Sequence, residues 1–159
     1  MQGIRKIGTM AAITAFLIFS LASMAQGQQK TQDATKEGTL VVMANGFKSG
    51  GGQFIMNVFV SKAGYPLDSS KALRKVIGEV THETMEISVE SIPFGSYAVT
   101  VLHDADSSGK MTTGFLGMPK EAIGISNNPR SYFGTPDYED AIFTFKEDKM
   151  TISINLHSH

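Results

Sequence analysis

Six stretches of this chain alternate apolar and polar residues, and this alternation limits the possible folds more than any other feature. The clearest stretch, residues 85–92, reads MEISVESI, and the others are residues 40–44, 54–60, 97–101, 141–145 and 150–156. A period of two residues is typical of a β-strand with one face in a core and the other in water. Residues 76–80 suggest a seventh strand, and residues 69–75 suggest a short helix capped by Ser69 or Ser70. Six or seven short strands separated by turn residues predict an all-β sandwich of two sheets.

Two connections between these strands stand out. Residues 45–52 contain four glycines, which favours a hairpin between the first two strands. Residues 103–139 are rich in Gly, Ser, Thr, Asp, Asn and Pro and contain no clear strand pattern. A loop of this length is uncommon in a compact domain and is usually functional when it is ordered. We therefore expect any binding site to lie in the 103–139 loop.

The N-terminus has the three parts of a cleavable export signal. Arg5 and Lys6 form a basic start, an apolar stretch follows from Ala11 to Ala22, and small residues occupy the cleavage site at Ala25. The apolar stretch is shorter than the roughly 20 residues that a membrane span needs. We expect a signal peptide at residues 1–25, a flexible linker at 26–37 and one domain at 38–159, located in the periplasm or secreted. No integral membrane span would remain after cleavage.

Composition excludes several classes of function. Removal of residues 1–25 takes away two of the 14 basic side chains and none of the 15 acidic ones, which leaves a net charge of about −3. A mildly acidic domain lacks the basic patch of a nucleic-acid-binding protein. The chain contains no cysteine, so thiol chemistry, zinc–thiolate sites and disulfide bonds are absent.

The strongest chemical pattern is the start of a calcium-binding loop at Asp104–Lys110, DADSSGK. Calcium prefers six to eight oxygen ligands, which alternate residues of a tight loop can supply. The candidate ligands are Asp104, Asp106, Ser108, Lys110 through its carbonyl, and Thr112 through water. The twelfth position is Phe115, where such a loop needs a bidentate glutamate, so a carboxylate must come from elsewhere; Glu121 is the nearest. The alternative is a polar turn whose Asp and Ser side chains bind their own backbone amides.

Other polar and aromatic residues have structural interpretations that compete with functional ones. His103 shares the face of Tyr97, Val99 and Val101, and it is either a metal ligand or base beside Asp104, or a buried strand-end residue. We expect the Tyr97 hydroxyl to bond to loop backbone. The terminal pair His157 and His159 would hold a transition metal on one strand face, or would belong to a frayed tail. The aromatic residues Tyr132, Phe133 and Tyr138 would form a ligand platform at the tip of the loop or would cover the end of the sandwich.

Several motifs together resemble a bacterial family, the domain of unknown function 2141. They are IPFGSYAV at residues 92–99, His103-Asp104, Gly109-Lys110, LGMPKE at 116–121 and GISNN at 124–128. The resemblance covers roughly residues 38–157. It implies an exported bacterial domain with an immunoglobulin-like or transthyretin-like β-sandwich, and it implies no activity. This chain has Asp106, Ser108 and Thr112 where the pattern favours Asn, Asn and Asp, so its loop carries fewer carboxylates after the Gly-Lys pair.

We therefore expect an exported, non-catalytic β-sandwich module with a binding or structural role. Its partner, if the role is binding, would belong to the cell envelope or extracellular space. One alternative is a metal-assisted hydrolase that uses His103, Asp104 and Asp106. Another is a carrier of a small apolar ligand held between the sheets. No nucleophile with an orienting partner is recognisable in the sequence, and calcium is the one cofactor that it suggests.

Overall fold

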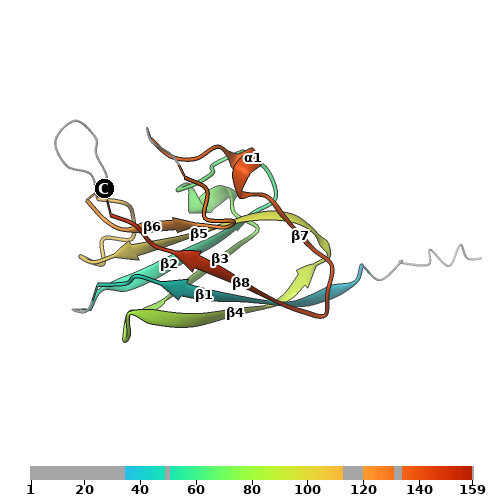
Figure 1. Cartoon of the computed structure of the whole chain (residues 1–159), viewed down its shortest axis with the longest axis horizontal. Coiled ribbons are helices and arrows are strands. Elements are labelled where there is room, and N and C mark those ends of the chain that lie inside the picture. Colours follow the sequence, from blue (N-terminus) through green and yellow to red (C-terminus); the bar gives the residue numbers. More distant parts are fainter. Residues whose placement is uncertain (1–34, 49–50, 113–119, 131–133, 159) are drawn as a thin grey trace, which may run out of the picture. The chain divides into compact units, whose positions relative to one another are not determined.

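The computed structural model describes residues 35–48, 51–112, 120–130 and 134–158, which form a β-sandwich (Figure 1). The export signal expected at residues 1–25 lies outside these ranges. Thr35 to His159 form one compact unit. Its first strand begins at Glu37, and the Lys36 carbonyl already accepts a hydrogen bond from Phe94 N–H, so the ordered domain begins slightly before residue 38. No helix within the described ranges has the length and hydropathy needed to cross a bilayer.

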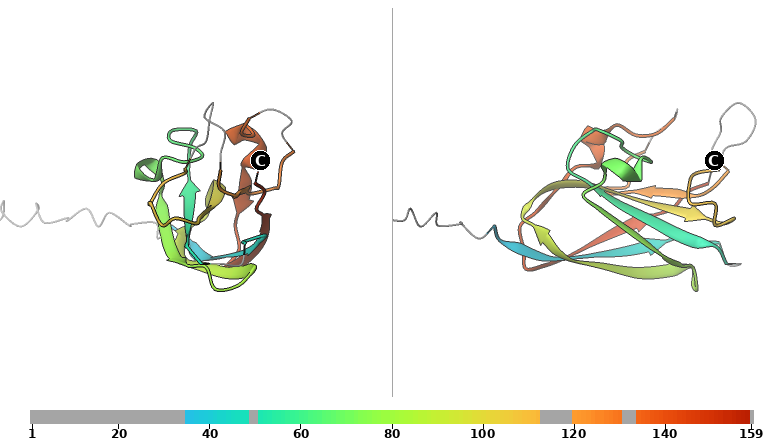
Figure 2. Two further views of the ribbon diagram at one scale, coloured as in Figure 1. Left: turned by 90° about the vertical axis from the view of Figure 1, so that its left-hand side faces the viewer. Right: turned by 180° about the vertical axis from the view of Figure 1, so that it is seen from behind.

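Two sheets face each other, as the views in Figure 2 show. The smaller sheet has the order β4-β1-β8, and the larger has the order β3-β2-β5-β6, with β7 also paired to β5. The strands are β1 (Glu37–Asn45), β2 (Gln53–Phe59), β3 (Arg74–Glu79), β4 (Thr84–Pro93), β5 (Gly95–Asp104), β6 (Ile123–Ile125), β7 (Phe143–Phe145) and β8 (Lys149–Asn155). This arrangement confirms the all-β sandwich that the alternating sequence predicts.

The alternating apolar residues fill the space between the sheets. Those with no exposed surface include Leu40, Val42, Met56, Val58, Val99 and Val101. Burial of this apolar area is the main stabilising contribution in a domain without disulfides. These side chains occupy the volume in which a carrier would hold an apolar ligand, so the packing argues against that alternative.

Three local predictions are wrong. The glycine-rich 45–52 segment is not a hairpin: β1 and β2 belong to different sheets, so this segment crosses between them. Alternation defines which face of a strand is apolar but not which strand is its partner. The expected helix is a single 3-10 turn, η1 (Ser69–Lys71), and its cap is Asp68 rather than Ser69 or Ser70. Ala141 ends the short helix α1 (Tyr138–Ala141) instead of beginning a strand.

A second layer covers the outer face of the larger sheet, so β2 and β5 are buried on both faces. The segment between β2 and β3 and helix α1 both lie on this outer side (Figure 1). Phe59 and Ala98 of the sheet pack there against Tyr138 and Ala141, with the Tyr65 ring edge-on to Tyr138. Tyr138 therefore has a covering role, but over the outer face of the larger sheet rather than over the end of the sandwich. Tyr132 and Phe133 lie outside the described residues.

The Tyr97 hydroxyl donates a hydrogen bond of 2.6 Å to the Pro93 carbonyl, and the ring is buried in the core. This confirms the expected bond from the hydroxyl to loop backbone, and it fixes the turn that leads from β4 into β5.

Tyr97→Phe should lower the free energy of unfolding by about 1 kcal/mol, because it removes one hydrogen bond and leaves the ring in place. Urea denaturation of both proteins would measure the difference. An unchanged midpoint would show that this bond contributes nothing net.

Candidate functional site

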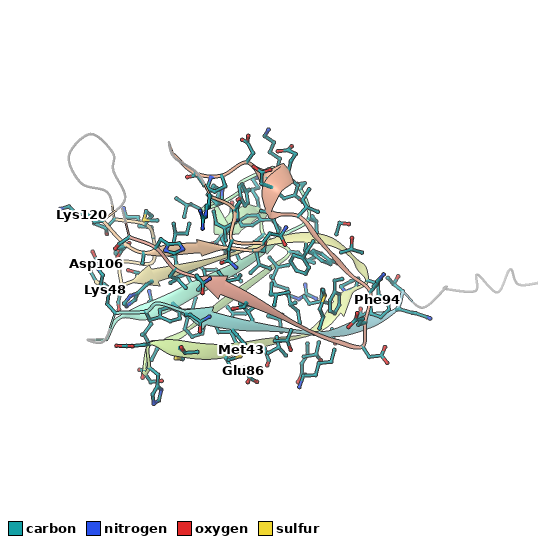
Figure 3. The ribbon with its side chains drawn as sticks, viewed as in Figure 1. Met43, Lys48, Glu86, Phe94, Asp106 and Lys120 are labelled. Atoms are coloured by element: carbon teal, nitrogen blue, oxygen red, sulfur yellow. The ribbon has the colours of Figure 1, made fainter. Side chains whose placement is uncertain are left out.

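Three carboxylates gather at one end of the sandwich. One oxygen each from Asp104, Asp106 and Glu121 lies within 4.8 Å of the others. Asp104 is the last residue of β5, Asp106 belongs to the turn that follows, and Glu121 comes just before β6. Figure 3 places Asp106 with Lys48 and Lys120 at this end, opposite the end that holds Phe94. Glu121 is the additional carboxylate that the sequence suggested in place of Phe115, which lies outside the described residues.

Asp104 organises the turn from a fully buried position. Its carboxylate accepts hydrogen bonds from Ser108 N–H (3.0 Å) and Gly109 N–H (2.7 Å), and from the Gln53 side chain of β2 (2.7 Å). Gly109 has a φ of +81°, a conformation that glycine adopts without strain and that the predicted sharp turn needs. The Ser108 hydroxyl lies 3.4 Å from the same carboxylate. A buried carboxylate is tolerated because these donors replace water.

Glu121 ties the far end of the segment to the same turn. It is 6% exposed, and its two oxygens accept hydrogen bonds from Ala105 N–H (3.0 Å) and Thr112 N–H (2.7 Å). These contacts connect the residues before β6 to both arms of the loop after β5. Among the described residues each Glu121 oxygen has one donor, which leaves it a lone pair for another ligand.

Asp106 is exposed and completes the group. It accepts hydrogen bonds from Ser108 N–H (3.1 Å) and from the Thr112 hydroxyl (2.9 Å). The Ser108 and Thr112 side chains hold the pKa of Asp106 below its usual range. The carboxylate is therefore ionised at neutral pH, as a cation ligand must be.

The five predicted site residues form one connected network. Asp104, Asp106 and Ser108 are in direct contact, and the Ser108 hydroxyl donates to the Lys110 carbonyl (2.9 Å), which orients this oxygen toward the turn. Thr112 joins through its hydroxyl and its amide. The polar-turn interpretation is thus correct as a description of the bonds: Asp and Ser side chains do bind loop amides.

The geometry also fits a calcium ion. Two oxygens that bind the same calcium at 2.3–2.6 Å can lie no more than about 5 Å apart, and the three carboxylates meet this limit. Among the residues that the structure describes, no basic side chain forms a salt bridge with any of the three; the ion pair found joins Lys62 to Glu139. The site therefore has concentrated negative charge and oxygen ligands, and contacts with the described part of the chain leave lone pairs on Asp106 and Glu121 for a cation.

The glycine-rich β1–β2 connection packs directly against this site. A side chain at Gly52 would come within 2.7 Å of the Asp104 carbonyl oxygen and the Ala105 Cα atom. His103 fastens the same connection: its Nδ1 accepts Lys48 N–H (3.4 Å), and its Nε2 lies 3.0 Å from the Gly51 carbonyl. The ring is 3% exposed and edge-on to Phe47.

The hydrolase alternative needs His103, Asp104 and Asp106 to converge, and the structure brings together only the two aspartates. Both ring nitrogens of His103 already engage backbone groups of the β1–β2 connection, and His103 is outside the carboxylate group found among the described residues. The buried-residue interpretation of His103 fits these contacts better than a role as metal ligand or base.

Of the two terminal histidines, the structure describes His157 alone. His157 N–H and C=O both bond to Ile123 of β6, so the chain is ordered to that point rather than frayed. His159 lies outside the described residues, and the idea of a transition-metal pair stays a prediction.

Sequence reasoning missed a structural clamp formed by Ser126, Asn127 and Asn128. The buried Ser126 hydroxyl donates to the Ala141 carbonyl (2.6 Å) and accepts Val99 N–H (2.9 Å). The Asn127 side chain donates to the carbonyls of Asp140 and Ile142, and the Asn128 side chain bonds to the backbone of Ser153 and Asn155 in β8. Positive φ values at both asparagines allow these three adjacent side chains to reach three different elements. The sequence signal for this clamp was the GISNN motif at residues 124–128, which contributed to the family resemblance but suggested no structural role.

Comparison with known proteins identifies the family but not an activity. The family model described as "Uncharacterized protein conserved in bacteria (DUF2141)" matches residues 42–153, a range that contains the three carboxylates and the clamp. Searches of curated proteins and of solved structures return no match. This chain therefore belongs to that uncharacterised bacterial family.

Proposed function

We propose that this protein is an exported, non-catalytic β-sandwich module that binds a calcium ion between Asp104, Asp106 and Glu121. The observation that carries the proposal is the approach of these carboxylates to within 4.8 Å of one another. Carboxylates this close repel one another, and a divalent cation bound between them would attract all three.

The ion would join two parts of the chain that are distant in sequence. Asp104 and Asp106 belong to the turn after β5, whereas Glu121 precedes β6, and the hydrogen bonds from Ala105 and Thr112 already hold Glu121 beside the turn. Ser108 and the Lys110 carbonyl are further oxygen ligands at the same turn. Because Asp104 is already saturated with donors, calcium would displace the Gln53 side chain or bind mainly through Asp106 and Glu121.

Export supports this choice of cation. The basic start, short apolar stretch and small cleavage-site residues of the N-terminus direct the chain out of the cytoplasm. Calcium sites in extracellular modules have dissociation constants of about 10⁻⁴–10⁻³ M. A calcium-ordered loop would then present a fixed surface to a partner in the cell envelope or beyond it.

The non-catalytic role follows from what the site residues contact. The carboxylates are engaged with backbone amides, and His103 uses both ring nitrogens to hold the β1–β2 connection. A general base needs a free nitrogen or oxygen that faces substrate, and both ring nitrogens of His103 are engaged. The remaining lone pairs of Asp106 and Glu121 would bind the cation, which favours a structural or binding role for the loop.

Calcium should raise the melting temperature of the chelator-treated protein. At a concentration of about ten times the dissociation constant, a ligand that binds only the native state adds about 1.4 kcal/mol, which corresponds to roughly 3–8 °C for a domain of this size. Differential scanning calorimetry with and without calcium would measure the shift.

Two variants make this experiment specific. Asp106→Asn keeps the size of an exposed side chain and removes one ligand charge, so it should abolish most of the calcium-dependent shift. Glu86→Gln, on the exposed face of β4 in the other sheet (Figure 3), should retain the whole shift. No shift in the wild type, or an equal shift in Asp106→Asn, would refute the proposed site.

A further inference from the structure

We propose that the free edge of β3 pairs with the same edge of a second copy of this chain, which forms a symmetric dimer with one continuous sheet. β3 ends the larger sheet and pairs with β2 alone, so its other edge has no strand beside it among the described residues. An open edge of this kind is a template for strand addition.

The hydrogen-bonding pattern identifies the backbone groups on that edge. Val80 N–H donates to the Gly52 carbonyl (3.1 Å), one step beyond the Gln53–Glu79 pair, so Gly52 and Val80 are a hydrogen-bonded pair. Bonded and non-bonded pairs alternate along an antiparallel ladder. The N–H and C=O groups of Lys75, Ile77 and Glu79 therefore point away from β2, toward the free edge.

Bonds on the far side of the same sheet give the same alternation. His103 N–H donates to the Ala122 carbonyl, and Ser126 N–H donates to the Val99 carbonyl, so the odd-numbered residues of β5 face β6. The even-numbered residues of β5 then face β2, and continuing across β2 again leaves the odd-numbered residues of β3 on the outside.

The side chains on this edge complement their own image. Lys75, Ile77 and Glu79 stand opposite Asn57, Ile55 and Gln53, on the face away from the smaller sheet. Ile77 is 49% exposed, and the oppositely charged Lys75 and Glu79 lie two residues before and two residues after it.

In one register each of Lys75, Ile77 and Glu79 has a favourable partner in the second copy. When two β3 strands run antiparallel with Ile77 opposite Ile77 of the second copy, Lys75 of each chain faces Glu79 of the other. All three pairs are then hydrogen-bonded pairs, which exchange N–H and C=O bonds. A shift by two residues in either direction places Lys75 or Glu79 opposite Ile77 and loses both ion pairs. A one-residue shift is excluded because it would bring inner-face residues opposite outer-face residues.

A contact made by one strand edge is small, so the dimer should be weak and visible at protein concentrations of roughly 0.1–1 mM. Sedimentation velocity on the purified protein over this range would detect it. Lys75→Glu and Glu79→Lys should each weaken the dimer about tenfold or more, because each places like charges opposite one another at both ends of the pair. Lys149→Glu on the exposed part of β8 is the matched control and should leave the dimer unchanged.

Mixing the two charge variants provides the decisive test. The Lys75→Glu edge is wholly acidic and the Glu79→Lys edge wholly basic, so an equimolar mixture should form a heterodimer although each variant alone is monomeric. The double variant Lys75→Glu/Glu79→Lys should dimerise like the wild type. The proposal would be overturned if the wild type stays monomeric throughout the range, or if neither charge reversal changes the dissociation constant of the dimer.

Discussion

Replacing Asp104 by alanine should lower the free energy of unfolding by about 3–5 kcal/mol, the largest effect expected from any single change at the site. The carboxylate has no exposed surface, and it accepts hydrogen bonds from two backbone amides of the turn and from Gln53 of β2. Its removal leaves these three partly buried donors without the acceptor that fixes the turn, and each unsatisfied group costs about 1–3 kcal/mol.

Chemical denaturation of Asp104→Ala in the presence of a chelator would measure this loss without any contribution from an ion. Asp68→Ala is the matched control, because Asp68 also accepts bonds from a serine that follows it in the chain, Ser70, but is exposed. It should cost far less than Asp104→Ala. Equal losses in the two variants would show that the burial of Asp104 does not increase its contribution to the free energy of unfolding.

Ser126→Ala should lower the free energy of unfolding by about 2–4 kcal/mol although it deletes a single oxygen atom. The Ser126 hydroxyl is 1% exposed, and it links Val99 N–H of β5 to the carbonyl of Ala141 at the end of α1. The substitution leaves one donor and one acceptor without a partner at a buried position.

The control for this substitution is Ser88→Ala, at an exposed position of β4, which should change stability by no more than about 0.5 kcal/mol. Hydrogen exchange gives a second measurement, because the amide of Val99 should lose protection in Ser126→Ala more than other amides of β5. If Ser126→Ala matches the control in stability, the clamp does not stabilise the fold.

Sequence alternation predicted the sheet faces well because burial on one side of a strand imposes a period of two. It failed where both sides are buried: β5 reads as a one-sided strand, yet Ala98 and Leu102 on its outer face are also covered. The cover comes from segments that are distant in sequence, between β2 and β3 and around α1, so no local pattern in β5 reveals it.

The sequence pattern also could not predict which strands pair or where a very short strand lies. The glycines between β1 and β2 predicted a hairpin, but the connection leads from one sheet to the other. β6 has only three residues, too few for a periodic signal, and it was missed within the 103–139 loop. The pairing of β6 with β5 places Glu121 beside Asp104, so the site depends on a strand that the alternating pattern does not reveal.

The candidate site itself was largely predictable, since its chemistry lies in side-chain types at short spacing. Asp104, Asp106 and Ser108 converge because a tight turn directs alternate residues inward, and Glu121 was the nearest carboxylate that remained after Phe115 failed the pattern. The role of His103 was open because a strand-end histidine has the same sequence signature whether it binds backbone or metal.

Isothermal titration of calcium into the chelator-treated protein tests the proposed site most directly. We expect one ion per chain with a dissociation constant of about 10⁻⁴–10⁻³ M, and binding at least about tenfold weaker in Asp106→Asn. Absence of binding at millimolar calcium, or equal binding by the wild type and Asp106→Asn, would contradict it and would leave the three carboxylates as anchors of the turn alone.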